Sequence, residues 1–163
     1  MDHLLLDLQL LLLLITANGI PILARKWLGS RWDGAIDGGR QAWDGRPWLG
    51  ASKTWRGLLA ALCLTPPLSL LLGLGAMTGL LIAIGAMAGD LLSSFLKRRL
   101  GIEPSGRALL LDQVPEALLP LLLVASRLQL GLADILFLVL VFILLELVLS
   151  RILYALNIRR RPY

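Results

Sequence analysis

Asp90 carries the clearest indication of chemistry in this sequence, because it lies inside an apolar stretch that ends in a basic run. Ser93, Ser94 and Lys97 follow it by three, four and seven residues. At about 100° per residue in an α-helix these side chains share one face, which gathers a carboxylate, hydroxyls and an ammonium group in one small volume. An ionisable residue in an apolar helix is a candidate for function, and a purely structural ion pair is the alternative for Asp90.

A second carboxylate, Asp112, directly precedes another apolar stretch. Asp is a favoured helix N-cap, and Pro115 and Glu116 suit a first helical turn, so capping is one interpretation. The other is metal binding, because two carboxylates near many cations suit an Mg²⁺ ion that serves phosphate groups. On the second interpretation, Asp90 and Asp112 bind Mg²⁺ together.

The long polar stretch of residues 25–56 supplies cations and Gly-rich turns. Gly-rich backbone can direct N–H groups at phosphates, and side chains such as Lys53 and Arg56 can neutralise them. All five Trp residues lie between positions 27 and 55, and they can also form an aromatic belt at a membrane interface. The sequence has no GxxxxGK[ST] run, which disfavours a P-loop nucleotide site.

Composition predicts the elements that must position these residues. Of the 163 residues, 57% are hydrophobic and 17% are charged, against about 25% charged in an ordinary soluble domain. This excludes a water-soluble globule, and nucleic-acid binding is disfavoured because the basic residues lie between Leu-rich blocks. We expect an all-α, polytopic integral membrane protein with one membrane domain over residues 1–163. The single Cys63 excludes an intrachain disulfide.

Five apolar blocks predict about five transmembrane helices, since each crossing needs about 20 residues. If the spans alternate in direction, 14 of the 16 Lys and Arg residues lie in two loops and a basic tail. Arg151 lies close to the tail on the same side, which leaves Arg127 as the only basic residue near the other face. By the positive-inside rule the loops and the C-terminus are cytoplasmic and the N-terminus is outside, which places the site on the cytoplasmic side of the cell membrane. The predicted spans are residues 4–24, 57–74, 77–96, 114–130 and 132–156, with loops at 25–56 and 97–113.

Other polar and small residues lie within the predicted spans. Asn18 lies inside the first predicted span, beside Gly19 and Pro21. Glu146, with Arg151 just over one turn later, is interpreted as a structural pair or a snorkelling contact. Gly85 and Gly89 suit close helix packing, either within one chain or in a homodimer.

Residues 89–113, GDLLSSFLKRRLGIEPSGRALLLDQ, resemble the signature region of the membrane CTP:lipid-phosphate cytidylyltransferases, which include CDP-diacylglycerol synthase and the compact CDP-archaeol synthase. SKTWRG at 52–57 resembles the Ser/Lys/Thr/Trp/Gly motif that these enzymes carry before the preceding span. The five-span layout, with ANGIPILARK at 17–26 and DGRPWLG at 44–50, is most similar to the compact archaeol-type branch. The larger diacylglycerol enzymes have a His-Gly-Gly-like segment where this chain has RALLL, so no His role is carried over.

The resemblance implies a nucleotidyl transfer in which a lipid phosphate oxygen attacks the α-phosphorus of CTP and pyrophosphate leaves. It implies Mg²⁺ as the cofactor, with Asp90 and Asp112 as its ligands and Asp37 as a third candidate. CTP and a lipid phosphate are the implied substrates. The implied catalytic and substrate contacts are the cations Lys53, Arg56, Lys97 and Arg98, the hydroxyls of Ser52, Thr54, Ser93 and Ser94, and the amide of Asn18. The alternative role of Asn18 is to brace a broken helix.

Other functional classes make different predictions. A small membrane transporter would place its key carboxylate near the bilayer midplane, whereas Asp90 lies about two turns from the predicted cytoplasmic boundary. A lipid-surface protein gives no reason for an ordered Asp–Ser–Lys face. A CTP-dependent polyprenol kinase is the nearer alternative, and it would release CDP instead of pyrophosphate. The Leu-rich helices suit acyl and isoprenoid chains alike, so the sequence does not choose between phosphatidic and archaetidic acid.

Overall fold

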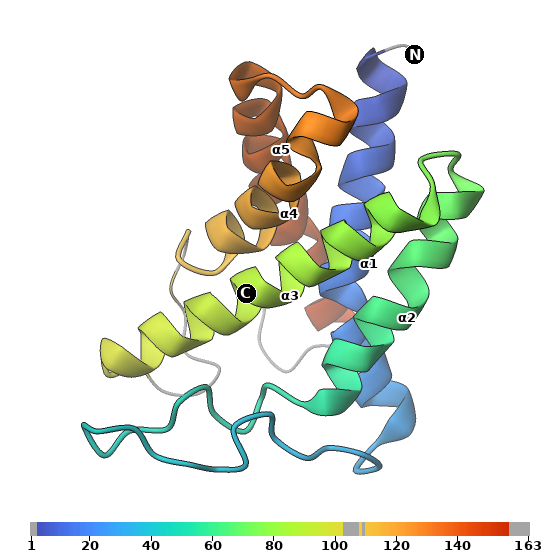
Figure 1. Ribbon diagram of the computed structural model, residues 1–163. Helices are drawn as coiled ribbons and strands as arrows, with labels where there is room; N and C mark the ends of the chain where they lie inside the picture. The colour runs from blue at the N-terminus through green and yellow to red at the C-terminus, as the bar shows by residue number, and fades with distance from the viewer. Residues whose placement is uncertain (1–2, 103–107, 109, 157–163) are drawn as a thin grey trace.

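The computed structural model describes residues 3–102, 108 and 110–156, and within these residues it is built from five α-helices without a β-sheet. Each of the five apolar blocks corresponds to one helix, which confirms the all-α prediction. Two isolated bridges, Ala35–Thr54 and Gln41–Pro47, close the 29–54 loop on itself. Arg107 and the basic tail lie outside the described residues. The helices are α1 (His3–Leu28), α2 (Trp55–Leu71), α3 (Ala76–Arg99), α4 (Gln113–Leu128) and α5 (Leu132–Ala155) (Figure 1).

Three helices of the described chain, α1, α3 and α5, are long and apolar enough to cross a membrane. The other two are shorter, at 17 residues for α2 and 16 for α4, or roughly 25 Å at 1.5 Å per residue. Large apolar side chains such as Leu71, Leu132 and Phe137 are exposed along the helices. Such an outer surface suits contact with lipid chains, in agreement with the membrane protein expected from composition.

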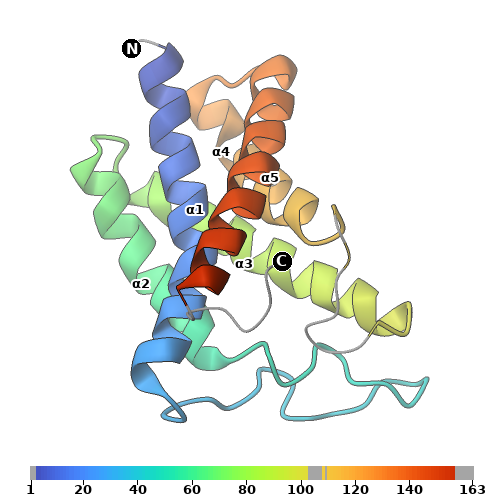
Figure 2. The same cartoon turned by 180° about the vertical axis from the view of Figure 1, so that it is seen from behind.

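The helix α1 contacts each of the other four helices and forms the centre of the core. Its fully buried Leu10, Leu13 and Leu14 belong to the same apolar cluster as Ile82 of α3 and Phe142 of α5. Figures 1 and 2 show the start of α1 and the turn between α4 and α5 at one end of the molecule. The 29–54 loop and the basic end of α3 lie at the opposite end. Most of the described polar chain is therefore gathered at one end.

Two glycines let α4 lie directly on α3. A Cβ atom at Gly85 would be 2.4 Å from the Cα of Pro120, and one at Gly89 would be 2.2 Å from the carbonyl oxygen of Pro115. Both distances are shorter than real Cβ contacts, so glycine is required for this approach. These glycines therefore pack helices within the chain. The contact at Gly89 also places the first turn of α4 beside Asp90.

Candidate active site

A lysine–aspartate pair joins the end of α3 to the start of α4. Lys97 Nζ lies 2.7 Å from Asp112 Oδ1, and the Lys97 side chain is 10% exposed. Asp112 occupies the N-cap position of α4, but its side chain makes no capping hydrogen bond. The predicted N-cap position of Asp112 is therefore confirmed, but the predicted capping by its side chain is wrong. Its carboxylate is turned toward α3, where the metal interpretation needs it.

A second lysine–aspartate pair joins the long loop to α3. Lys53 Nζ donates a hydrogen bond to Asp90 Oδ1 across 37 residues of sequence. The Lys53 backbone is held on both sides, because its N–H donates to the Gly50 carbonyl at 3.1 Å and its own carbonyl accepts from the Ile36 N–H at 2.8 Å. The folded loop thus delivers Lys53 to Asp90 from a fixed backbone position. The structural ion pair considered for Asp90 exists, and its partner is Lys53.

Glu116, in the first turn of α4, connects the two pairs. Its carboxyl group interacts electrostatically with that of Asp90, and the residue is buried, with 9% exposed. Lys53 interacts electrostatically with Asp90, Glu116 and Asp112, and Lys97 interacts with Asp90 as well as with Asp112. These five residues form one group of two ammonium and three carboxyl groups, which we call the charged cluster.

The charged cluster keeps Lys53 protonated. Burial lowers the pKa of Lys53 and is the largest single effect, but the negative charges of Asp90, Glu116 and Asp112 together outweigh it. The result is a pKa above the ordinary value of 10.5. Lys53 is therefore an ammonium ion at neutral pH and can bind a phosphate group that enters the site.

A cavity of about 490 Å³ opens beside the Lys53–Asp90 pair, between α1, the 29–54 loop, the start of α2 and the middle of α3. This volume is within the range of small-molecule sites. Thr54 is the N-cap of α2 and accepts from the Gly57 N–H at 3.3 Å, so the positive end of the α2 dipole borders the cavity and favours an anion there. Of the predicted site residues, the cavity lining includes Ser52, Lys53, Thr54, Arg56 and Asp90.

The two serines predicted to supply hydroxyls to the substrate are turned into the protein. Ser93 is fully buried, and its hydroxyl donates to the Asp90 carbonyl at 3.0 Å. Ser94 is 2% exposed. Neither is among the cavity-lining residues of the described chain. Because α4 covers this face of α3, the serines contribute to packing and to the backbone near Asp90.

Arg56 and Asn18 bond to backbone carbonyls. Arg56 is 5% exposed, and its Nη1 donates to the carbonyls of Gly29 and Arg31, both at 2.7 Å. It lines the cavity but holds the chain that leaves α1, so we assign it to shaping the cavity instead of to binding phosphate. Asn18 Nδ2 donates to the Leu14 carbonyl at 2.9 Å within α1. That bond favours the bracing role for Asn18.

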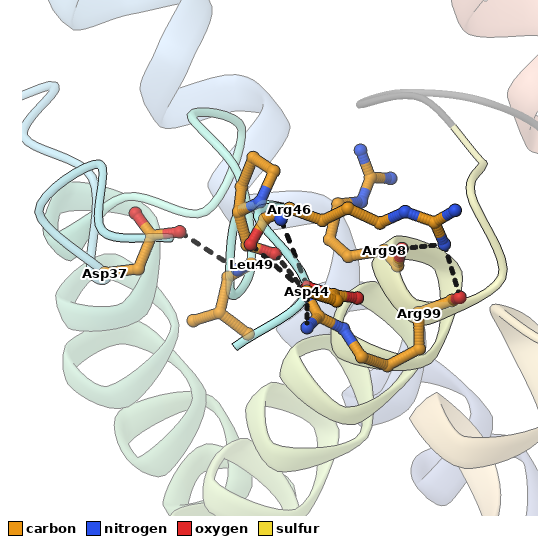
Figure 3. Close-up of polar contacts among 7 residues, drawn as sticks. Asp37, Asp44, Arg46, Leu49, Arg98 and Arg99 are labelled. Carbon is orange, nitrogen blue, oxygen red and sulfur yellow. Dashed lines mark hydrogen bonds and ion pairs between the residues drawn. The ribbon is translucent and has the colours of Figure 1, made fainter. Parts of the chain in front are cut away.

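Reciprocal arginine contacts strap the long loop to the end of α3 (Figure 3). Arg46 Nη1 donates to the carbonyls of Arg98 and Arg99, at 3.3 and 2.6 Å, and so satisfies acceptors at the helix C-terminus. Arg99 in turn donates to Asp44 Oδ1 and to the Pro47 carbonyl, both at 2.6 Å. Arg98 itself is 4% exposed. The strap holds the loop against the helix that carries Asp90 and Lys97.

Asp37 serves the fold of the loop. Its Oδ2 accepts from the N–H groups of Leu49 and Gly50, at 2.9 and 2.8 Å, and its Oδ1 accepts from Gly39 at 3.0 Å (Figure 3 shows the Leu49 bond). Burial acts to raise the pKa of Asp37, but these hydrogen bonds outweigh it and lower the pKa below the ordinary value of 3.8. A metal ligand role for Asp37 would compete with all three bonds, so we do not include it in the metal site.

The tryptophans at the end of α1 and in the first part of the loop lie at the surface. Trp27, Trp32 and Trp43 are 75–80% exposed, which suits the aromatic belt considered from sequence. Trp43 also packs with Trp48 at a centroid distance of 5.4 Å. Trp48 stacks on Phe95 of α3 at 5.7 Å, which adds an apolar contact to the arginine strap.

Comparison with known proteins identifies the family. Residues 65–163 match the CarS-like family, described as CDP-archaeol synthase. A CDP-archaeol synthase of Hyperthermus butylicus is 41% identical over 106 residues, which cover 61% of this chain and 60% of that relative. A CDP-archaeol synthase of Sulfolobus acidocaldarius is 33% identical over 134 residues, which cover 78% and 82%. The chain belongs to the CDP-archaeol synthase family. This confirms the resemblance found in the sequence.

The fold agrees with the CDP-archaeol synthase assignment. A solved structure described as an intramembrane enzyme for archaeal membrane lipid biosynthesis superposes with a TM-score of 0.70. It is 32% identical in sequence, and the match covers 85% of this chain and 91% of that one. Together with the apolar helices, this likeness supports a multi-pass membrane protein.

The family resemblance implies an Mg²⁺ ion. The carboxylates of the charged cluster can hold Mg²⁺ only if phosphate groups supply some of the remaining ligands. The described residues contain no group of three or more His, Cys, Asp and Glu arranged to hold a metal. Mg²⁺ usually takes one or two carboxylates and completes its shell with waters and substrate phosphates. Asp90 and Asp112, each 24% exposed in the side chain, match that requirement.

Sequence reasoning missed the role of Glu116. An acidic residue in a first helical turn is common because it complements the helix dipole, so its type and position gave no special signal. The available clue was Gly89, whose missing side chain allows α4 to approach Asp90. The Asp44–Arg99 pair was missed for a similar reason, since its partners are 55 residues apart.

Proposed function

We propose that this protein is an Mg²⁺-dependent cytidylyltransferase that converts CTP and a membrane lipid phosphate, of archaetidic or phosphatidic acid type, to a CDP-lipid and pyrophosphate. The observation that carries the proposal is the Lys53–Asp90 pair, which borders a cavity of about 490 Å³ and belongs to the charged cluster. The family supports the reaction, because the relatives from Hyperthermus butylicus and Sulfolobus acidocaldarius are named CDP-archaeol synthase.

In this reaction a phosphate oxygen of the lipid forms a bond to the α-phosphorus of CTP. The bond from that phosphorus to the bridging oxygen breaks, and pyrophosphate leaves with the bridging oxygen. The negative charge is spread over phosphoryl oxygens, so catalysis depends mainly on in-line positioning and on cations. When bound, Mg²⁺ would neutralise and orient phosphate oxygens, and Asp90 and Asp112 are the residues that would hold it.

The lysines of the charged cluster are proposed to bind the phosphates. Lys53 and Lys97 are paired with the same two aspartates that we assign to Mg²⁺. As the nucleotide enters, each lysine exchanges a carboxylate partner for a phosphate oxygen, which leaves the carboxylates available. Ser52 and Thr54 are at the cavity wall, at the positive end of α2, and would contact the same anion.

We propose that the protein lies in the cell membrane with this site on the cytoplasmic side, where the basic residues concentrate by the positive-inside rule. The described loop, with its cations, and the basic end of α3 support this orientation, since they lie at the same end of the molecule (Figures 1 and 2). The homodimer stays a prediction, because Gly85 and Gly89 are used for packing inside the chain.

The test is a product assay with purified protein in liposomes, [α-³²P]CTP and Mg²⁺. Separate arms contain archaetidic acid, phosphatidic acid or a polyprenol. We expect labelled CDP-lipid and an equal amount of pyrophosphate in at least one lipid phosphate arm, and comparing the two identifies the preferred lipid. Release of CDP with the polyprenol arm would instead identify a kinase. Folded protein that makes no labelled lipid with either lipid phosphate would refute the proposal.

The metal assignment has its own test in Asp90→Asn and Asp112→Asn. Each substitution keeps the size of the side chain and removes its charge, so turnover should fall by about 10²-fold or more while membrane insertion is preserved. Asp134→Asn is the control, because Asp134 accepts a hydrogen bond from the Gly131 N–H at the far end of the molecule. Rates near those of the unmodified protein in both variants would contradict the assignment.

A further inference from the structure

The cavity beside the Lys53–Asp90 pair holds a cation to which neither the sequence nor the proposed reaction gives a task. Three basic residues line this cavity: Arg25, Lys53 and Arg56. Lys53 is paired with Asp90, and Arg56 donates to two backbone carbonyls. Within the described chain, the Arg25 side chain is exposed and makes neither a hydrogen bond nor an ion pair. Arg25 can therefore bind a ligand without giving up a partner.

The proposed reaction brings two sets of phosphate charges into this cavity. Its described lining contains two carboxylates, Asp33 and Asp90, beside the three basic residues. Lys53, held at the carboxylate assigned to Mg²⁺, can serve the nucleotide. The lipid phosphate must approach the α-phosphorus from the side opposite to the leaving pyrophosphate, because the attacking and leaving oxygens lie roughly in line. A cation on another wall of the cavity can hold it there, and Arg25 is on α1 whereas Asp90 is on α3.

Arg25 lies where the phosphate of a membrane lipid is expected. It is in the last turn of α1, directly after the apolar part of that helix, and lipid phosphates lie at the boundary between hydrocarbon and water. Pro21 precedes Arg25 by four residues on the same helical face and also lines the cavity. Because α1 runs toward the loop end of the molecule (Figure 1), Pro21 lies one turn closer to the middle of the bundle. Leu58 of α2 and Met87 of α3 add to this apolar part of the lining, which suits the first groups of the lipid chains.

We propose that Arg25 binds the phosphate of the lipid substrate, while Lys53 binds phosphates of the nucleotide. This inference rests on the proposed function of the site. A guanidinium group can donate two parallel hydrogen bonds to one phosphate, so it fixes the direction of that group and also balances its charge. Arg25 takes part in no bond change. It orients the lipid phosphate so that one oxygen faces the α-phosphorus of CTP.

The first experiment measures the KM for the lipid phosphate and the KM for CTP separately in the CDP-lipid assay, with the lipid phosphate varied as a mole fraction of detergent micelles. Arg25→Gln removes the charge. Lys26→Gln is the matched control, because Lys26 is the neighbouring basic residue of the same turn, is also exposed and is not among the described residues that line the cavity. Both variants lose one positive charge at the same end of the molecule, so a general attraction of anionic lipids to this surface changes equally in both.

The expected result is a change in one KM and not in the other. Arg25→Gln should raise the KM for the lipid phosphate by about tenfold or more and leave the KM for CTP within about twofold. Arg25→Lys keeps the charge but loses the two parallel donors, so its KM for the lipid phosphate should lie between those of Arg25→Gln and the unmodified protein. Lys26→Gln should leave both values within about twofold of the unmodified protein.

The second experiment needs no turnover. Native mass spectrometry in detergent, without CTP, compares the binding of phosphatidic acid with that of the diacylglycerol of the same chains, and the binding of archaetidic acid with that of archaeol. The unmodified protein and Lys26→Gln should prefer the lipid that carries the phosphate, and Arg25→Gln should lose about tenfold of this preference. Damage to the fold would weaken both lipids of a pair equally, so the preference reports the phosphate contact.

The two experiments separate this inference from the proposed function. The inference is overturned if Arg25→Gln leaves the KM for the lipid phosphate or the phosphate preference unchanged, if it raises the KM for CTP equally, or if Lys26→Gln shows the same loss. If the unmodified protein makes no CDP-lipid but its phosphate preference depends on Arg25 as expected, the proposed reaction fails and the lipid phosphate contact is supported. If CDP-lipid forms and neither measurement depends on Arg25, the inference fails alone.

Discussion

Replacing Gly89 by Ala tests whether the contact between α3 and α4 sets the geometry of the charged cluster. The added Cβ would lie 2.2 Å from the Pro115 carbonyl oxygen, 2.5 Å from its carbonyl carbon and 2.8 Å from the Glu116 nitrogen. Ordinary contacts of a Cβ begin near 3.4 Å, and all three neighbours are backbone atoms that cannot rotate away. The first turn of α4 must therefore move away from α3 by about 1 Å.

A movement of this size separates groups that are now in contact. Asp112 would be drawn away from Lys97, whose Nζ is 2.7 Å from its Oδ1, and Glu116 would be drawn away from Asp90. Misplacement of reacting groups by about 1 Å can reduce a rate by about 10²-fold, and overpacking of this kind costs about 1–3 kcal/mol. We expect Gly89→Ala to lower kcat/KM for CTP by about a hundredfold and to lower the melting temperature.

The assay is CDP-lipid formation at saturating Mg²⁺, together with thermal unfolding in detergent. Gly19→Ala is the matched control, because Gly19 is also within a helix and a Cβ there would meet nothing within 4 Å. Ala is also the better helix former, so the control should be fully active and at least as stable. Gly89→Ala protein with unchanged activity and melting temperature would refute the packing argument, as would an equal loss in the control.

Three more predictions concern the loop that delivers Lys53. Arg56→Met removes the two 2.7 Å hydrogen bonds that Arg56 donates to carbonyls of the chain after α1. Limited proteolysis should then cut residues 29–54 faster, and the KM for CTP should rise. An unchanged digestion pattern would contradict the role of Arg56 in shaping the cavity. Because the pKa of Asp37 is lowered, its stabilising effect is complete above 3.8 and is lost as the pH falls through the lowered pKa. The melting temperature should therefore fall more steeply below pH 4 in the unmodified protein than in Asp37→Asn. Parallel plots of melting temperature against pH would contradict the stabilising role of the Asp37 carboxylate. Lys53→Met should raise the KM for CTP by about tenfold or more, measured by initial rates; an unchanged KM would exclude a phosphate contact.

The helical architecture follows from hydropathy because lipid and protein interior both select apolar residues. Each predicted span overlaps one helix, yet the edges differ in ways that hydropathy does not report. The first helix continues to Leu28, past the basic residues Arg25 and Lys26, since a helix need not end where its sequence becomes polar. The second begins at Trp55 because Thr54 caps it.

The site was predictable in part. Helical spacing correctly put Asp90, Ser93 and Lys97 near one another, but spacing does not say what covers that face. Because Gly85 and Gly89 admit α4, the face is internal, and Ser93 donates to the backbone. The partners of Asp90 come from a loop 37 residues earlier and from another helix, and such pairings depend on the folded chain.

The two interpretations of Asp90 from sequence, ion pair and metal ligand, are compatible with each other under the proposed function. A carboxylate in an apolar helix needs a partner, because an unpaired charge there is costly. Lys53 supplies that partner, and its raised pKa keeps it charged. A phosphate group that attracts Lys53 would leave Asp90 unpaired unless a cation arrives with it. Under the proposed function, this coupling would favour entry of the nucleotide together with its metal over entry of either one alone.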